Sequence, residues 1–421
     1  MPVNREELGR RLKDAREACG LTQEDVGKKF DLSRSTIAQM ELGKREVTSL
    51  ELDRLAFLYG KDIRFFLSEG VLEGDVMTVL FRAHPELRRD EPMMDALRRT
   101  LAMGRELSNL EDLLEVEREV LLPGVYALKS PKTRWEAIQQ GAAVAADERR
   151  RLDLGDDPIQ DIAEVLESGG VRTGEVPLSE DVSGLTVDGP DIGILVVVNK
   201  EHPKIRQRFS FAHEYAHVLL DRDRPTVSRA SERDDLREVR ANAFAAAFLM
   251  PDEGVRRYVG GLGKGQQSRS TADVYDEEDV IRVQRRTMPG TQDLQIYDLV
   301  QLAHQFGVSE IAALYRLRNM KPPLVTEVEF ERLKVIVEAQ RSREIRAGLG
   351  LPEPEEYWRR REFRHRFLSL GLEAYRRDLI SRTKLIEIAR LVDTLPDAME
   401  RLIADSGVEE GQEGDFSVSE G

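Results

Sequence analysis

Residues 213–217 read His-Glu-Tyr-Ala-His, and this spacing requires a helix if its two imidazoles are to meet. On an α-helix, side chains four positions apart lie one above the other, so both rings can bind the same zinc ion. Glu214 then lies beside the metal, where a carboxylate can take a proton from a water molecule. The pattern therefore predicts His213 and His217 as metal ligands and Glu214 as the catalytic base.

Zinc in a peptidase takes three protein ligands and keeps one position open, so a third ligand must come from elsewhere in the chain. Asp223 follows His217 by six residues, a distance at which some metzincins place an Asp, but Leu220 stands where that design needs Gly. Glu238 is the favoured candidate, because it shares one helical face with Asn242 in REVRANAFAAAFLMP. Small residues, Ala241 and Ala245, would let this helix approach the first. We expect Asn242 to hydrogen-bond a ligand.

A second informative stretch is residues 12–60, LKDAREACGLTQEDVGKKFDLSRSTIAQMELGKREVTSLELDRLAFLYG. Apolar residues recur at helical spacing, and the breaks fall at Gly20, Asp31-Leu32-Ser33 and Gly43. Thr22 and Ser33 are expected N-caps, because a hydroxyl oxygen can accept a free backbone N–H. The closing helix is expected to bury Leu50, Leu52, Leu55 and Ala56. Two short helices across such a turn form the unit that lays its second helix in the DNA major groove.

The outward side of that unit carries residue types that contact DNA. Arginine can read guanine, glutamine can read adenine, and threonine can contact the methyl group of thymine. The residues at the start of the second helix are expected at base edges, and those near the two turns at phosphates. The predicted DNA contacts are Thr22, Gln23, Ser33, Arg34, Ser35, Thr36, Gln39, Lys44 and Arg45.

This segment resembles the XRE-type helix-turn-helix of phage-repressor-like regulators over about 60 residues. The resemblance rests on GLTQ, the turn before Ser33, Ile37, and E-x-G-x-R from Glu41 to Arg45. Gly27 departs from the usual Ala, and Val47 departs from the usual Pro. The resemblance implies a double-stranded DNA operator as partner. A homodimer is a further expectation, since such domains usually bind as dimers on two-fold sites.

The metal segment also resembles a known family. RQRFSFAHEYAHVLL, followed by E-x-x-A-N-x-F-A-A-x-x-L-M-P, is similar to the ImmA/IrrE metallopeptidases, from about Trp135 through DLVQLAHQFGVSEIAALYRLRNM. The resemblance implies a gluzincin-like fold with Zn²⁺ held by His213, His217 and Glu238, and with Glu214 as general base. It also implies a protein substrate, since family members cleave repressor-like regulators or related partners in prophage, mobile-element or stress control. An XRE-type domain on the same chain is a known arrangement.

Composition limits the alternatives. The single cysteine, Cys19, excludes an intrachain disulfide and a multi-cysteine zinc site. The net charge of −15 argues against nonspecific nucleic-acid binding, but residues 1–70 hold 13 basic and 13 acidic residues and are neutral. No apolar run approaches the roughly 18 residues needed to span a bilayer. The first residues, MPVNREELGRR, have no apolar signal core, which predicts a cytoplasmic protein without membrane contact.

The predicted fold class is mainly α with a small α+β part. We expect a helix-turn-helix domain at 1–68, a helical connector at 69–130 that is either a spacer or a dimerisation element, and a zincin-like domain at 131–255. A helical accessory region follows at 256–400, beginning with a flexible loop over 260–292, and an acidic disordered tail covers 401–421. Strands are predicted at 171–176, 183–187 and 192–199. The last of these is interpreted as an edge strand that pairs with substrate, and a buried core strand is the alternative.

Residues 296–317 look like a second helix-turn-helix, but Glu310 and Ile311 are poor readers of DNA, which favours a helical accessory packed on the peptidase. Residues 371–392 predict a further helix pair for packing or self-association. The leading functional hypothesis is a DNA-bound zinc endopeptidase that cleaves one regulatory protein, either a repressor-like partner or itself. The alternatives are a transcription factor with a non-cutting metal site and an antitoxin-like protein that holds a partner.

Overall fold

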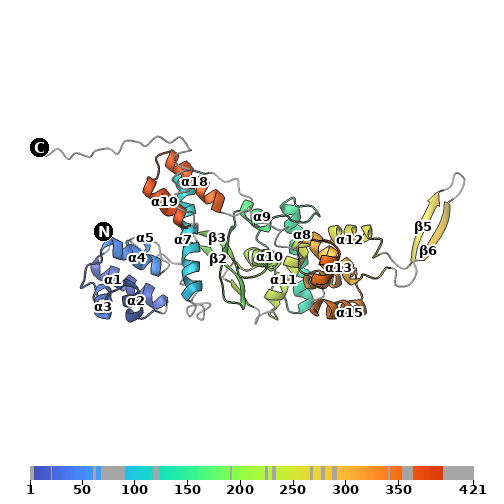
Figure 1. The fold of residues 1–421 in the computed structure, drawn as a ribbon, viewed down its shortest axis with the longest axis horizontal. Helices are drawn as coiled ribbons and strands as arrows, with labels where there is room; N and C mark the ends of the chain where they lie inside the picture. Colours follow the sequence, from blue (N-terminus) through green and yellow to red (C-terminus); the bar gives the residue numbers. More distant parts are fainter. Residues whose placement is uncertain are drawn as a thin grey trace.

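The structure is a computed structural model of the 421-residue chain. It describes residues 4–19, 21–59, 63–67, 91–116, 123–189, 192–222, 226–229, 234–265, 269–275, 280–286, 292–339, 342–352 and 364–391. A helical bundle lies at one end, a four-stranded sheet lies near the middle, and a β-hairpin projects at the other end (Figure 1). The predicted tail at 401–421 lies outside the described residues. Among those described, no helix is both long and apolar enough to cross a membrane.

The N-terminal bundle has the predicted helix-turn-helix architecture. Its helices are α1 (Arg5–Ala18), α2 (Gln23–Phe30), α3 (Arg34–Glu41), α4 (Ser49–Leu58) and α5 (Ile63–Leu67). Thr22 and Ser33 cap α2 and α3 as predicted, each accepting a backbone N–H with its side chain. Val26 and Ile37 are buried between the helices. The expectation that Leu50 points inward was wrong: it is 68% exposed, because it stands at the solvent side of the first turn of α4.

The turn between α2 and α3 is unusually close. Asp31 ends α2 in the left-handed region with φ 55°, which an Asp tolerates better than most residues. A Cβ at Gly27 would lie 2.6 Å from the carbonyl oxygen of Leu32. The glycine that departs from the usual Ala is therefore the residue that this close turn requires.

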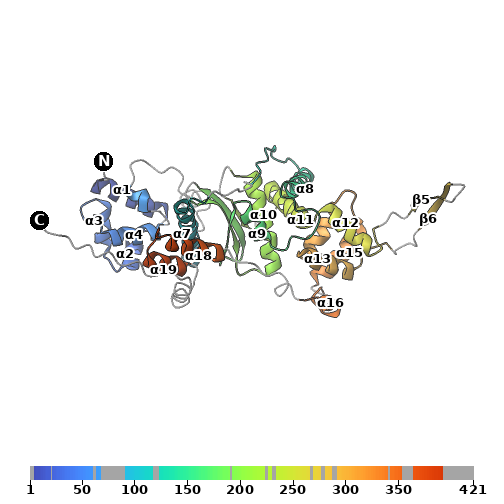
Figure 2. The ribbon, with the colours of Figure 1, turned by 90° about the horizontal axis from the view of Figure 1, so that it is seen from above.

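A long helix, α7 (Glu91–Leu113), joins the bundle to the rest of the molecule within the predicted connector. Its first half, including Leu97 and Leu101, belongs to one continuous apolar core with the bundle and with the outer face of the sheet. Arg172, in the first strand of the sheet, links α7 to the sheet. Its guanidinium group donates to the carbonyl oxygen of Gly104 in α7 and to that of Ile192. Figures 1 and 2 both place α7 between the bundle and the sheet.

The sheet has the strand order β1-β3-β2-β4. Its strands are β1 (Arg172–Val176), β2 (Val182–Gly189), β3 (Gly193–Asn199) and β4 (Thr226–Arg229). β3 runs parallel to β1 and antiparallel to β2, and β4 pairs antiparallel with β2. The prediction that residues 192–199 form an edge strand was wrong. β3 is buried on both faces from Leu195 to Asn199, as its unbroken apolar run suits, and β4 lies at the edge.

Three helices pack on the inner face of the sheet. The core between them and the sheet contains Val196 and Val198 of β3. The helices are α8 (Arg134–Arg151), α10 (Lys204–Leu220) and α11 (Leu236–Leu249), with the short α9 (Ile162–Ser168) beside them. Arg208 and Tyr215 of α10 each form hydrogen bonds within this core. Arg208 donates to the carbonyls of Ile159 and Gln160, and the Tyr215 hydroxyl donates to Glu148.

The same core extends through the next helices up to Leu333, so the second helix-turn-helix-like segment packs on the inner-face helices. These helices are α12 (Asp252–Gly261), α13 (Ile296–Phe306), α14 (Glu310–Asn319) and α15 (Glu327–Glu338), and α16 (Ser342–Gly348) follows them. The chain then returns to α7, where α18 (Arg364–Arg376) and α19 (Arg382–Leu391) cover the second half of that helix through Phe367 and Ile388.

The predicted flexible loop over 260–292 was wrong in part. It contains an antiparallel hairpin of β5 (Arg269–Tyr275) and β6 (Val280–Arg286). Seven consecutive residue pairs connect the two strands, from Arg269↔Arg286 to Tyr275↔Val280. The run Val280-Ile281-Arg282-Val283 alternates apolar and polar residues only in part, which hid a strand among charged and small residues.

Substitution of Gly141 by Ala should destabilise the protein. A Cβ at this position of α8 would lie 2.3 Å from the carbonyl oxygen of Arg240 and 2.8 Å from the backbone nitrogen of Phe244. Because both atoms are backbone, α11 itself must move, and we expect a loss of about 1–3 kcal/mol in the free energy of unfolding, measured by urea denaturation. Gly260→Ala is the control, since a Cβ there meets nothing within 4 Å. Equal stability of the two variants would contradict this packing.

Candidate metal centre

The two histidines lie side by side on α10, one turn apart. The helix is buried from Ser210 to Leu219, so both rings are held in a packed interior. The Nε2 atoms of His213 and His217 are 3.2 Å apart. The Nε2 atoms of the two rings therefore face the same small volume, where both could bind one metal ion.

Glu238 of α11 completes this cluster. Its Oε2 lies 3.1 Å from Nε2 of His213, and its Oε1 lies 3.3 Å from Nε2 of His217. The three residues offer donor atoms that all lie within 4.8 Å of one another. Two nitrogens at ordinary bonding distance from a tetrahedral zinc ion would be about 3.3 Å apart, so the donor set and its spacing both fit that metal.

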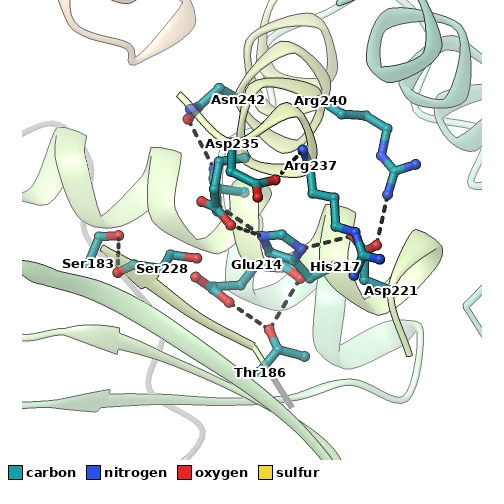
Figure 3. Close-up of polar contacts among 12 residues, drawn as sticks. Ser183, Thr186, Glu214, His217, Asp221, Ser228, Asp235, Arg237, Arg240 and Asn242 are labelled. Atoms are coloured by element: carbon teal, nitrogen blue, oxygen red, sulfur yellow. Dashed lines mark hydrogen bonds and ion pairs between the residues drawn. The ribbon is translucent and has the colours of Figure 1, made fainter. Parts of the chain in front are cut away.

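Each imidazole uses its second nitrogen for a different partner. Nδ1 of His213 lies 3.0 Å from Oδ1 of Asn242, the residue predicted from its place on α11. Nδ1 of His217 lies 3.0 Å from Oδ2 of Asp221, which the sequence analysis did not single out (Figure 3). Its position four residues after His217 was the available signal. Asp223, the alternative third ligand, lies outside the described residues.

The carboxylate of Glu214 lies against β2, away from Asn242 and Asp221. The hydroxyl of Thr186 donates to its Oε2 at 2.7 Å, and a Cβ at Gly184 would lie 2.8 Å from its Oε1. That Oε1 is buried and has no partner of good hydrogen-bond geometry among the described residues, although the Ser228 side chain lies close enough to lower the pKa of the carboxyl group. The absence of a side chain at Gly184 thus makes room for a carboxylate oxygen that is available to a proton.

The charges of the site are strongly coupled. Burial alone would lower the pKa of His217, but hydrogen bonds to Asp221 and Glu238 raise it to about 10. Burial opposes ionisation of Glu238, yet hydrogen bonds to the two imidazoles lower the pKa of its carboxyl group. Burial raises the pKa of Glu214. Because a bound cation must displace the proton from His217, metal binding should weaken as the pH falls.

Four of the predicted DNA contacts have exposed side chains, although the hydroxyl of one of them, Ser35, lies 2.7 Å from that of Ser33. Arg34, Ser35, Gln39 and Lys44 are exposed on or just after α3. Gln23 instead donates to Glu41, which also forms a buried ion pair with Arg16.

The other predicted contacts are used within the bundle as well. Arg45 donates to Glu51, and Thr22 and Ser33 act as caps. The Thr36 hydroxyl lies 2.8 Å from that of Ser33.

Comparison with family models finds matches for two segments of the chain. Residues 7–62 match a helix-turn-helix domain, and residues 170–318 match the IrrE N-terminal-like domain, whose model is named Peptidase_M78. The chain joins a helix-turn-helix domain to an IrrE-like peptidase domain. No curated protein matches the chain. The IrrE-like domain includes the sheet, α10, α11 and the helices α13 and α14, so all residues of the His213–His217–Glu238 cluster lie inside it.

The IrrE-like domain should hold about one zinc ion per chain through the three converging donors. His217→Ala and Glu238→Ala should each lose most of the bound metal, because three-ligand sites rarely survive the loss of one ligand. Metal content after dialysis, measured by atomic emission, tests this. His304→Ala is the control, since this histidine lies on α13 outside the cluster. Full zinc content in the Glu238 variant would remove that residue as a ligand.

Proposed function

We propose that this chain is a DNA-binding transcriptional regulator whose IrrE-like domain is a zinc-dependent endopeptidase. Its substrate would be a specific regulatory protein, either a repressor-like partner or the chain itself, in stress, prophage or mobile-element control. The supporting observation is the convergence of His213, His217 and Glu238 beside a buried Glu214. A purely structural site would not need a carboxylate oxygen held next to the donors without a partner of good hydrogen-bond geometry.

The proposed chemistry assigns a task to each carboxylate oxygen of Glu214. Zinc, when bound, would polarise a water molecule and the substrate carbonyl. Oε1 accepts the proton of the attacking water and later passes it to the leaving nitrogen. Oε2 stays fixed by the Thr186 hydroxyl, so the carboxylate cannot rotate away. Burial, which raises the pKa of Glu214, favours the protonated form that this carboxylate would adopt after taking the proton.

The edge of the sheet supports an extended substrate. β4 is the terminal strand beyond β2, and Ser228 of β4 pairs in register with Gly184, directly beside Glu214. A peptide added along β4 would gain main-chain hydrogen bonds and pass close to the candidate metal centre. Residues 226–229, and not residues 192–199, are therefore the edge strand that would pair with the substrate.

The N-terminal domain would bring this activity to DNA. Arg34, Ser35 and Gln39 project from α3, the helix that enters the major groove in this motif, while Lys44 follows it. The residues already engaged within the bundle, such as Gln23 and Arg45, can still reach phosphates if they exchange partners. Their cost of rearrangement makes them weaker contributors than the exposed residues.

Glu214→Gln should retain zinc but stop cleavage. The amide keeps the size of the carboxylate and can still accept from Thr186, yet it cannot take a proton, so we expect cleavage to fall by a factor of about 10²–10⁴. The measurement is co-expression with the repressor-like regulators encoded beside its gene, followed by immunoblotting for fragments. Asp188→Asn, an acid-to-amide change at an exposed position of β2, should cleave normally. Undiminished cleavage by the Glu214 variant would exclude it as the base.

Arg34→Ala and Gln39→Ala should reduce sequence discrimination. Each should cost about 1–3 kcal/mol on a site selected from random DNA and much less on unrelated DNA, because base contacts carry the specificity. Lys44→Ala should weaken binding to both and lower the salt dependence, as expected for a phosphate contact. Fluorescence anisotropy at several salt concentrations measures these effects, with Lys13→Ala as an exposed control on α1. A loss that is equal on all DNA would contradict base reading by Arg34 and Gln39.

A further inference from the structure

We infer that Asp221 and Arg240 form a positioning pair that fixes His217 for the metal and joins the two ligand-bearing helices. This inference rests on the proposed metal site. Neither residue lies among the three donors, and in the described part of the chain their side-chain hydrogen bonds run to His217 and to each other. Their role would be exerted through the imidazole of His217.

The contacts form an unbroken chain from the site to α11. Oδ2 of Asp221 lies 3.0 Å from Nδ1 of His217, and Oδ1 of the same carboxylate accepts from a guanidinium nitrogen of Arg240 at 2.8 Å. Asp221 is 6% exposed and Arg240 is 3% exposed. Both carboxylate oxygens are thus used, one for the imidazole and one for the cation.

Burying such a pair is costly, which indicates a specific use. Removing two charges from water costs several kcal/mol per ion, and mutual attraction repays this only when the geometry is good. The pair lies at the C-terminal end of α10, and an apolar contact there would avoid the cost of burying charges. What an apolar contact would not provide is an acceptor that holds Nδ1 protonated and so leaves Nε2 of His217 free to bind a metal.

The positions on α11 explain why the cation is an arginine. Glu238 faces the donors, and Asn242, four residues on, lies on nearly the same side of the helix. Arg240, two residues on, starts about 200° around the axis from Glu238, on the far side. Figure 3 shows its long side chain reaching around α11 to Asp221. One helix therefore supplies a ligand, the partner of His213 and the anchor for the partner of His217.

The two imidazoles are held by partners of different charge. His213 faces the neutral amide of Asn242, whereas His217 faces the carboxylate of Asp221. A carboxylate makes an imidazole a stronger donor to a metal than an amide does. Loss of Asp221 should therefore weaken metal binding more than loss of Asn242.

The test is the zinc dissociation constant of the full chain, measured by competition with a chromogenic chelator. Asp221→Ala should weaken zinc binding by about 10–100-fold, and Asn242→Ala should weaken it less. Arg240→Met should weaken it in the same direction by a smaller factor. Because Arg240 acts only through Asp221, the double variant should match Asp221→Ala within about twofold, since groups acting through one another are not additive.

A second readout and a conservative variant keep the test decisive. The visible spectrum of the Co²⁺-loaded protein should change in Asp221→Ala, because the orientation of His217 changes. Asp221→Asn keeps an acceptor for Nδ1 and should recover part of the affinity if Asp221→Ala does not fold. Arg316→Met is the matched control, since it removes another buried arginine, paired with Asp252, without touching the site.

The outcomes separate this inference from the proposed function. Zinc binding that survives His217→Ala would overturn the metal site itself. Zinc binding that is lost in His217→Ala but stays within about twofold of wild type in both Asp221 variants would overturn only the positioning pair. An additive double variant would overturn the claim that Arg240 acts through Asp221.

Discussion

The packing of α11 between α8 and α10 decides whether the cluster of donors exists. Helices this close need small residues at the contact, and Gly141 supplies one where α8 meets the backbone of α11. Ala241 and Ala245 of α11 are fully buried in the same core. Any outward shift of α11 would carry Glu238 away from both imidazoles, because its carboxylate has no other way to approach them. The chemistry thus depends on a contact that lies on the opposite side of α11 from the ligands.

The two faces of the central sheet contact different parts of the molecule. On β2, Thr186 and Gly184 contact Glu214, while their neighbours Leu185 and Val187 belong to the core shared with α7 and the N-terminal bundle. This alternation follows from the two-residue repeat of a strand. Residues that contact Glu214 and residues that anchor the helix-turn-helix domain therefore alternate along one strand. The helix-turn-helix domain therefore packs, together with α7, against the IrrE-like domain through one shared apolar core.

Much of the site could be predicted because its signals are local. His213 and His217 are fixed by spacing on one helix, and Glu238 and Asn242 follow from one face of the next. Pairings between distant segments could not be predicted in this way. The position of β3 within the sheet, the hairpin over 269–286 and the link from Asp221 to Arg240 all depend on which elements become neighbours. The same limit explains Gln23 and Arg45, whose partners lie on other helices of the bundle.

The shared core around α7 would keep the two fragments together if the chain were cleaved. Leu97 and Leu101 pack with the bundle and the sheet together, and α18 and α19 cover the far half of α7. If the peptide bond were broken between α7 and the sheet, the two fragments would still be held by buried apolar surface. Scission alone would leave a nicked but assembled particle. Release of the helix-turn-helix domain would require a separate unfolding or extraction event, with its own rate.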